Sequence, residues 1–321
     1  MHTEIREWVK ENMLSAVEKL NIVTELQSSS LPLVSETPCT APRWVALNTH
    51  GALLYSADGK TWQQGQVLGA QIQETTRQVA FGNGSFVAVG RHLLTSTDGI
   101  CWHVRHRLRG SQSGHVAYSN GRWVCGTSNG TLLTSTDNGR TWRRQSRAFP
   151  GRILSVVAGK GIFVATGRAI DGRRMWSTSS DGRHWERIQV DGTPLKQVVY
   201  GNERFLGVDT NGHIHCSTDG VHWVQSLCPG NQVFTQVRAV NGVFLAITNH
   251  SGYCWSLEGC LWTSESGFLP QNVVYGGGTY VGRDTTGALF SARVLDAWDQ
   301  QNTPAHDFID FVYGIPKQGV Q

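Results

Sequence analysis

A short motif recurs six times along this chain and constrains its fold more than any other feature. The copies are Ser56–Trp62 (SADGKTW), Ser96–Trp102 (STDGICW), Ser135–Trp142 (STDNGRTW), Ser179–Trp185 (SSDGRHW), Ser217–Trp223 (STDGVHW) and Ser256–Trp262 (SLEGCLW). Their tryptophans follow one another at intervals of 40, 40, 43, 38 and 39 residues. A period near 40 residues with one turn motif in every copy is typical of a β-propeller.

The chemistry of the motif, called the box below, predicts a hairpin turn between two strands. An apolar strand precedes each box, and the glycine can adopt the positive φ that a tight turn needs. The Ser and Asp side chains can hydrogen-bond to the backbone of the turn, and the Trp can pack against the neighbouring blade. Because identical groups spread around a ring cannot converge on one substrate, we predict structural roles for Asp58, Trp62, Asp98, Trp102, Asp137, Trp142, Asp181, Trp185, Asp219, Trp223, Glu258 and Trp262.

The box resembles the Asp-box, or BNR repeat, of sialidase-like propellers, and the resemblance covers about residues 43–314. It implies an all-β propeller. A second pattern upstream of each box, such as QVAFGN at Gln78–Asn83, predicts the two inner strands of each blade. The first repeat lacks the innermost strand, and Phe308–Gly314 (FIDFVYG) matches its pattern. We therefore predict that strand 308–313 completes the first blade and closes the ring, which removes free sheet edges.

The seventh repeat, residues 271–298, carries a decayed box at Ser291–Trp298 that keeps the Ser-to-Trp spacing of Ser135–Trp142. The sequence thus predicts a seven-bladed β-propeller over residues 43–314 and a tail over 315–321. It is preceded by a helical arm over 1–26 and a Ser/Pro linker over 27–42. The arm has an apolar stripe at helical spacing, formed by Ile5, Trp8, Val9, Met13, Val17 and Leu20. Such a helix can fold back on the propeller or dock into a partner. The flexible linker favours docking.

Basic residues are concentrated in one part of the chain. The net charge is +4, yet residues 91–174 hold fourteen Lys or Arg and three Asp or Glu, a balance of +11. A one-sided basic surface attracts anionic partners, although acids nearby could also neutralise it. The candidate residues are Arg105, Arg107, Arg109, Arg143, Arg144, Arg147, Arg152, Arg168, Arg173 and Arg174. Possible partners are an acidic glycan, a lipopolysaccharide or an acidic protein subunit. No motif predicts specific nucleic-acid binding.

Catalytic motifs are not evident. Sialidases need an arginine triad, a Tyr–Glu pair and an early Phe/Tyr-Arg-Ile-Pro sequence; the nearest text here, Phe149–Ile153, lies in the wrong blade and lacks the proline. There is no nucleophile elbow, zinc-protease motif or phosphate-binding loop. The seven cysteines form no Cys-x-x-Cys pair and are expected to be reduced thiols, mostly buried. We therefore predict a non-enzyme without metal or cofactor.

The favoured function is a binding or assembly role within a large complex, such as a bacteriophage virion or tail that contacts a host surface. In this interpretation the helix joins other protein subunits. The alternatives are a bacterial assembly factor, resembling the Asp-box propeller that helps build photosystem II, and a lectin-like carbohydrate-binding propeller. A glycosidase is less favoured. The N-terminus shows no signal peptide, and no run approaches 18 apolar residues, so the expectation is cytoplasmic synthesis, incorporation into a phage particle and no membrane span.

Overall fold

The computed structural model describes residues 41, 43–68, 76–108, 111–145, 150–188, 195–230, 232–248, 252–301 and 307–316. The regular elements of this described part are all β-strands, so it holds no helix that could span a bilayer. The predicted arm (1–26), almost all of the linker and residues 317–321 of the tail lie outside the described residues.

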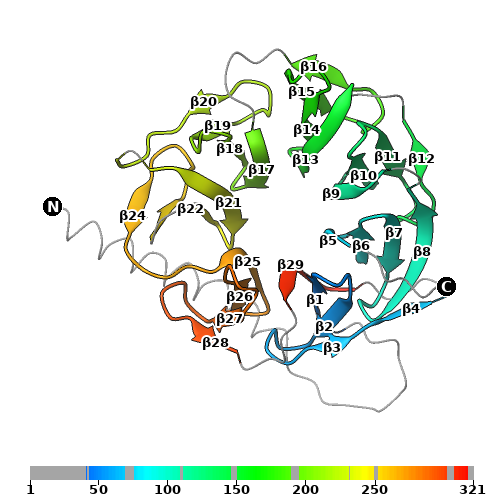
Figure 1. The fold of residues 1–321 in the computed structure, drawn as a ribbon, viewed down its shortest axis with the longest axis horizontal. Helices are drawn as coiled ribbons and strands as arrows, with labels where there is room; N and C mark the ends of the chain where they lie inside the picture. The colour runs from blue at the N-terminus through cyan, green and yellow to red at the C-terminus, as the bar shows by residue number, and fades with distance from the viewer. Residues whose placement is uncertain are drawn as a thin grey trace. The chain divides into compact units, whose positions relative to one another are not determined.

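Seven antiparallel sheets stand side by side in a ring, which confirms the predicted all-β, seven-bladed propeller (Figure 1). We number the sheets as blades 1 to 7 and call the strands of each blade A to D from the centre outwards. Blade 1 consists of β29 (Phe308–Gly314), β1 (Arg43–Asn48), β2 (Leu53–Ser56) and β3 (Gln63–Gln64). Blade 2 consists of β5 (Gln78–Gly82), β6 (Ser85–Val89), β7 (His92–Ser96) and β8 (Cys101–Arg107), with β4 (Gln66–Leu68) added parallel to β8.

The other five blades have four strands each. Blade 3 consists of β9 (Ser113–Ser119), β10 (Arg122–Thr127), β11 (Leu132–Ser135) and β12 (Arg143–Arg144). Blade 4 consists of β13 (Gly151–Gly159), β14 (Ile162–Ala169), β15 (Arg174–Ser179) and β16 (Glu186–Ile188). Blade 5 consists of β17 (Leu195–Gly201), β18 (Arg204–Asp209), β19 (Ile214–Ser217) and β20 (Val224–Gln225). Blade 6 consists of β21 (Phe234–Val240), β22 (Val243–Thr248), β23 (Tyr253–Ser256) and β24 (Thr263–Glu265). Blade 7 consists of β25 (Gln271–Gly276), β26 (Thr279–Arg283), β27 (Leu289–Ala292) and β28 (Asp299–Gln300).

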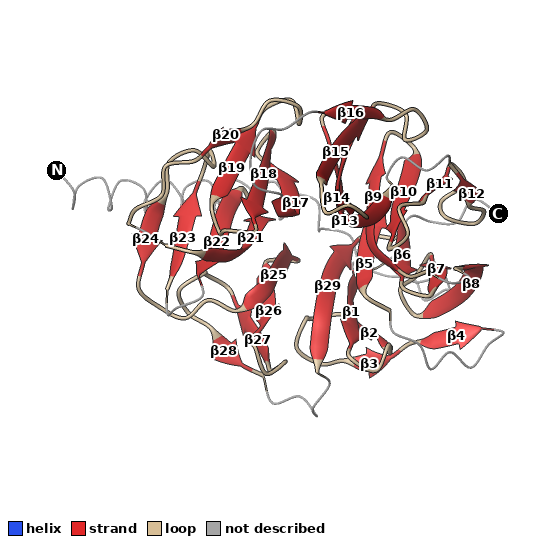
Figure 2. Cartoon of the chain, turned by 45° about the horizontal axis from the view of Figure 1, so that its top comes forward, coloured by secondary structure: helices blue, strands red, loops and turns tan. Residues whose placement is uncertain are grey.

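The turns of each blade divide between the two faces of the ring (Figure 2). Because neighbouring strands are antiparallel, the A–B turns and the boxes share one face, which we call the box face. The B–C turns lie on the other, the loop face. Asn-Gly turns with positive φ join strands A and B in several blades, for example Asn83–Gly84 and Asn120–Gly121. The hydrophobic core lies between the blades, where Phe86 and Trp102 are fully buried.

Blade 1 is closed by the last strand, as the sequence leads us to expect. β29 pairs antiparallel with β1, and Trp44 lies opposite Tyr313. Contacts between the innermost strands of neighbouring blades continue around a complete circuit. The first and last strands of the propeller therefore belong to one sheet, and the ring has no open edge between blades 7 and 1.

Polar side chains of strand A also link four pairs of neighbouring blades, because they accept hydrogen bonds from the backbone of the neighbouring strand A. The acceptor and donor residues are Asp310 and Val79 (3.0 Å), Gln78 and Val116 (2.7 Å), Ser155 and Val198 (3.4 Å), and Gln197 and Val237 (3.1 Å). Strand A is paired on one side only, so its other edge carries N–H groups that need acceptors inside the protein. These bonds satisfy part of that edge.

Glycine ends strand A in several blades and receives an aromatic ring from the next blade. A Cβ atom on Gly276 would lie 2.1 Å from the Tyr313 ring, closer than real contacts permit. We expect Gly276→Ala to destabilise the propeller by about 1–3 kcal/mol, the usual cost of overpacking. The control is Gly114→Ala in β9, where the nearest atom is 3.9 Å away. Chemical denaturation measures both, and equal stabilities would contradict this packing.

Asp310 makes the stability of the fold depend on pH. Burial raises the pKa of this carboxyl to about 6 from an ordinary 3.8, against the opposing effects of the Val79 N–H and the Arg238 guanidinium. The folded state therefore holds the proton more tightly than the unfolded chain. Stability from this group is complete below pH 3.8 and is lost as the pH rises to about 6. We expect the stability of the wild type relative to Asp310→Asn to fall by up to about 3 kcal/mol over this window. Urea titrations of both proteins measure the difference, and a constant difference would contradict the shift.

Candidate functional site

The boxes form compact hydrogen-bonded turns. In blade 3 the Ser135 hydroxyl donates to Asp137 Oδ1 (2.7 Å) and accepts from the Gly139 N–H (2.9 Å). The Thr141 N–H and hydroxyl both donate to the Asp137 carboxylate, at 2.9 and 2.6 Å. The Trp142 indole N–H donates to the Gly139 carbonyl (2.9 Å). Glycine is required here because its φ is +79° and its Cα lies against Thr95 of blade 2. Each of these hydrogen bonds joins two groups of the same box.

The box carboxylates Asp58 and Asp137 are unsuited to acid catalysis. Burial alone would raise the pKa of Asp58, but the N–H groups of Thr61 and Lys60 and the hydroxyls of Thr61 and Ser56 outweigh it and lower the pKa to about 2. The pKa of Asp137 is also lowered, because hydrogen bonds from Thr141 and Ser135 outweigh its burial. Such carboxylates stay ionised, and their oxygens accept hydrogen bonds from groups of the turn. In the described part of the chain, no three His, Cys, Asp or Glu side chains gather as metal ligands would.

The sixth and seventh boxes depart from this geometry. In blade 6 the Ser256 and Trp262 bonds are kept, but no hydrogen bond joins the Glu258 carboxylate to its turn among the described residues. Glu258, grouped with the box aspartates from sequence, therefore lacks the turn bonds that they make. In blade 7 the Trp298 indole still donates to a turn carbonyl, that of Leu295 (2.7 Å).

The structure separates the predicted basic residues into two groups. Arg105, Arg107, Arg143 and Arg144 lie exposed on the outer strands β8 and β12 of blades 2 and 3. Two of them are held locally, since Arg105 donates to the Thr95 hydroxyl (2.9 Å) and Arg144 to that of Thr131 (3.3 Å). Arg152, Arg168, Arg173 and Arg174 lie instead at the loop-face end of blade 4. Arg109 and Arg147 lie outside the described residues.

The blade-4 group forms a row across three strands. Arg152 in β13 pairs in register with Arg168 in β14, and Arg168 pairs with Arg174 in β15. Residues directly opposite in an antiparallel sheet lie on the same face, so the like charges of Arg152 and Arg168 repel each other. β13 and β14 are the longest strands of the propeller's described part, with nine and eight residues. The connecting loop presents Ile170, which is 91% exposed. We call Arg152, Arg168, Ile170 and Arg174 the blade-4 tip.

Within the described residues, no carboxylate forms an ion pair with Arg152 or Arg168 of the blade-4 tip. Among the described residues, the one arginine–carboxylate pair within 4 Å joins Arg173 to Asp171 (2.6 Å), and both side chains are exposed. Arg152 and Arg168 are exposed and have no such carboxylate. Burial, together with the charge of Arg152, lowers the pKa of the nearby His115 to about 4. His115 is therefore neutral at pH 7, and the positive potential there comes from arginine.

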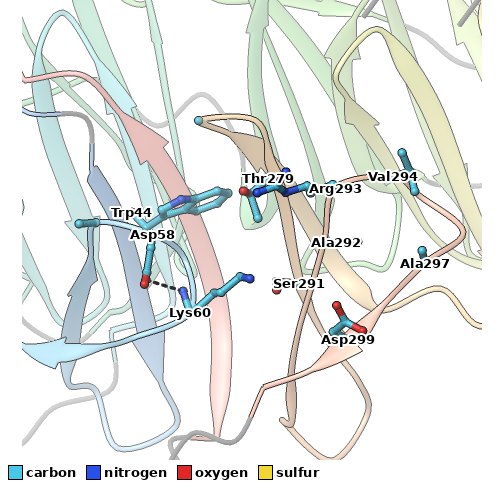
Figure 3. Close-up of a pocket in the computed structure, with 12 residues that line it drawn as sticks. Trp44, Asp58, Lys60, Thr279, Ser291, Ala292, Arg293, Val294, Ala297 and Asp299 are labelled. Carbon is cyan, nitrogen blue, oxygen red and sulfur yellow. Dashed lines mark hydrogen bonds between the residues drawn. The ribbon is translucent and has the colours of Figure 1, made fainter. Parts of the chain in front are cut away.

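A second feature lies between blades 7 and 1. A cavity of about 620 Å³ is lined by the box of blade 1, including Asp58 and Lys60, and by Arg293, Ser291 and Thr279 of blade 7. We call it the seam pocket. In Figure 3 the Lys60 side chain extends from blade 1 toward Ser291. The pocket lies where the decayed box takes the place of a regular turn, and sequence reasoning missed it. The loss of the Asp-Gly pair in Ser291–Trp298 was the available signal.

No protein-family model matches the chain, and no curated protein matches it. Solved structures do. YCF48 bound to D1 peptide is 16% identical with a TM-score of 0.58, covering 85% of this chain and 88% of that one. YCF48 from Cyanidioschyzon merolae is 12% identical with a TM-score of 0.56, covering 71% and 85%. Prp20p from Saccharomyces cerevisiae, described with its binding to Gsp1p and histones, is 10% identical with a TM-score of 0.52, covering 85% and 88%.

At these identities the likeness shows the fold alone. The β-propeller is therefore supported both by the sheets and by the structural neighbours, some of which bind peptides or proteins. The resemblance to the Asp-box family still rests on the motifs of the sequence.

Proposed function

We propose that this propeller is a non-catalytic binding protein of the Asp-box type that docks an acidic segment of a partner protein at the blade-4 tip. The observation that carries the proposal is the row of Arg152, Arg168 and Arg174 beside the exposed Ile170. An apolar anchor beside Arg152 and Arg168, which form no ion pair with a carboxylate among the described residues, suits a peptide that combines carboxylates with one apolar side chain. The neighbours that bind a D1 peptide and Gsp1p support a protein-binding role for such a fold.

The test compares the two groups of arginines. The probe is a labelled 12-residue Asp/Glu-rich peptide with one central Leu, and binding is measured by fluorescence anisotropy. We expect Arg152→Glu/Arg168→Glu to weaken binding at least about tenfold, equivalent to about 1.4 kcal/mol. The matched control, Arg143→Glu/Arg144→Glu, changes the net charge equally on the outer strands and should have an effect below about twofold. Equal losses of peptide affinity in both variants would show that binding depends on net charge alone. That result would contradict specific binding at the blade-4 tip.

Ile170→Ser provides an independent measurement, since it removes the apolar anchor and leaves every charge in place. Wild-type affinity should fall as salt rises, because exposed charges are screened beyond about 8 Å at physiological ionic strength. Ile170→Ser should weaken binding while keeping this salt dependence. An unchanged affinity would show that the tip binds by charge alone.

The finer hypothesis places the protein in a large assembly, with a bacteriophage particle as one form and a bacterial assembly factor as the other. It rests on the predicted arm, whose residues the structure does not describe. Deleting residues 1–30 should then leave a folded propeller that no longer joins its complex in co-purification. Normal incorporation of the shortened chain would contradict the arm as anchor.

The seam pocket favours a second candidate function, binding of a small polar ligand such as a sugar. Lys60 and Arg293 share the cavity with Asp58 and Asp299, and Thr279 and Ser291 line it with hydroxyl-bearing side chains. A single pocket at the irregular blade also differs from the seven equal sites of a lectin-like propeller. Lys60→Ala/Arg293→Ala should abolish any binding of wild-type protein on an array of acidic glycans. Hydrolysis of such a sugar by wild-type protein would contradict a non-catalytic role.

A further inference from the structure

Two arginines on the inner strands of blades 6 and 7 have buried donor atoms. Arg238 lies in β21, the innermost strand of blade 6, and Arg283 ends β26 of blade 7. The Arg238 guanidinium donates to the Asn272 side chain, and Arg283 Nη1 donates to the Asp284 carbonyl (3.0 Å). The Nε atoms of both arginines are buried and have no hydrogen-bond partner. Two charged donors therefore lie inside the protein without acceptors.

The charges of this cluster are not paired directly. Asp310 of blade 1 attracts both guanidinium groups, Asp284 also attracts Arg283, and the two arginines repel each other. No ion pair within 4 Å joins either carboxylate to Arg238 or Arg283 in the described part of the chain, and Asp310 Oδ2 accepts the Val79 N–H instead. The buried Nε–H groups of both arginines are therefore left without a carboxylate acceptor, which is unfavourable for a desolvated charged donor.

We propose that Arg238 and Arg283 form an anion-binding site inside the ring, which takes a small oxyanion or carboxylate between blades 6, 7 and 1. The class of ligand follows from the donors, because a guanidinium offers parallel N–H groups that match carboxylate, phosphate and sulfate oxygens. Arg238, Arg283 and Asp310 are each partly exposed, so the cluster is reachable from solvent despite its central position.

A water molecule alone would satisfy this cluster less well than an anion. A water molecule can accept from one orphaned Nε–H group, but its oxygen carries no full charge. An anion with several oxygens can accept from both arginines and binds their charged donors more strongly. Asn272 supports the arrangement from β25, since its amide accepts from Arg238 and donates to the Ile309 carbonyl of blade 1. The same residues thus join three blades where the ring closes.

The experiment uses the full chain with sulfate and phosphate as probes. Melting temperature is measured against sodium chloride at matched ionic strength. At ten times its dissociation constant, a bound anion should raise the melting temperature by about 2–3 °C, and the rise should saturate. Arg238→Gln and Arg283→Gln should abolish the rise, whereas Arg168→Gln at the blade-4 tip should retain it. The control also separates this site from the proposed docking function, which requires Arg168.

Arg283→Lys serves as a second variant, because it keeps the charge but loses the planar fork. This variant should fold normally and bind sulfate at least about tenfold more weakly than the wild type. Crystals soaked in selenate should show an anomalous peak within hydrogen-bond distance of both Nε atoms. Three outcomes would overturn the proposal: no saturable rise in the wild type, an equal rise in Arg238→Gln, or a peak elsewhere.

Discussion

Removal of residues 305–321 should abolish cooperative folding of the propeller. The deletion takes away β29, which buries Phe308 and Phe311 and pairs along the whole of β1. Loss of a buried phenylalanine side chain typically costs about 3–5 kcal/mol. Two such losses already approach the stability of a typical domain, which is about 5–15 kcal/mol. The freed edge of β1 would also be open to pairing with other chains.

The measurement is the thermal unfolding of soluble protein, followed by circular dichroism, together with the soluble yield. The matched control deletes residues 317–321, which leaves β29 intact, and should unfold within about 1 °C of the full chain. A synthetic peptide of residues 305–321, added to the long deletion, should restore part of the transition. Unfolding unchanged by the long deletion would show that the ring does not depend on its last strand.

Trp142→Ala should destabilise the protein by about 3–5 kcal/mol, the usual range for a buried large aromatic residue. The indole is 8% exposed and packs between blades 2 and 3 in a cluster with Val87 and Leu133. Its N–H bond to the Gly139 carbonyl is lost as well, which leaves that carbonyl without this donor. Urea denaturation measures the change in the free energy of unfolding. A cost below about 1 kcal/mol would contradict a stabilising role for the packing of Trp142 between blades 2 and 3.

The box carboxylates provide the matched comparison for this tryptophan. Asp137→Ala removes three hydrogen bonds from the turn of blade 3 and should cost about 1–2 kcal/mol. Glu258→Ala removes a carboxylate without turn bonds and should change stability by less than about 0.5 kcal/mol. A similar cost for both would mean that the turn bonds contribute little.

The fold could be predicted from the sequence because the same pattern of strands and boxes recurs along the chain. Each box fixes a turn by local chemistry, and six copies at one period fix a ring. Phe308–Gly314 was recognisable because it repeats the pattern of strand A, and Ser291–Trp298 because it keeps the spacing of a box. The arm has no such repetition, and its predicted residues Ile5–Leu20 lie outside the described part of the chain.

The candidate sites were less accessible to sequence reasoning because they depend on register and on distant contacts. Arg143 and Arg152 are close in sequence, yet one lies on an outer strand and the other on an innermost strand. Only the strand register groups Arg152 with Arg168 and Arg174. The sequence places Asp310 in a strand pattern. Its proximity to Arg238 and Arg283 is seen only in the folded ring. The available signal was a charged residue where other repeats have Gln, Ser, His or Asn.

The pairing of β29 with β1 has a consequence for how the protein reaches its native state. Every other blade is a local meander that can form as soon as its own segment is available, whereas blade 1 joins the two ends of the propeller sequence. Its contact order is therefore far higher than that of the other blades, and high contact order slows folding. During synthesis β1 waits with an unpaired edge until nearly the whole propeller has been made. We expect this late step to limit the folding rate and to set the period in which the nascent protein needs protection from aggregation.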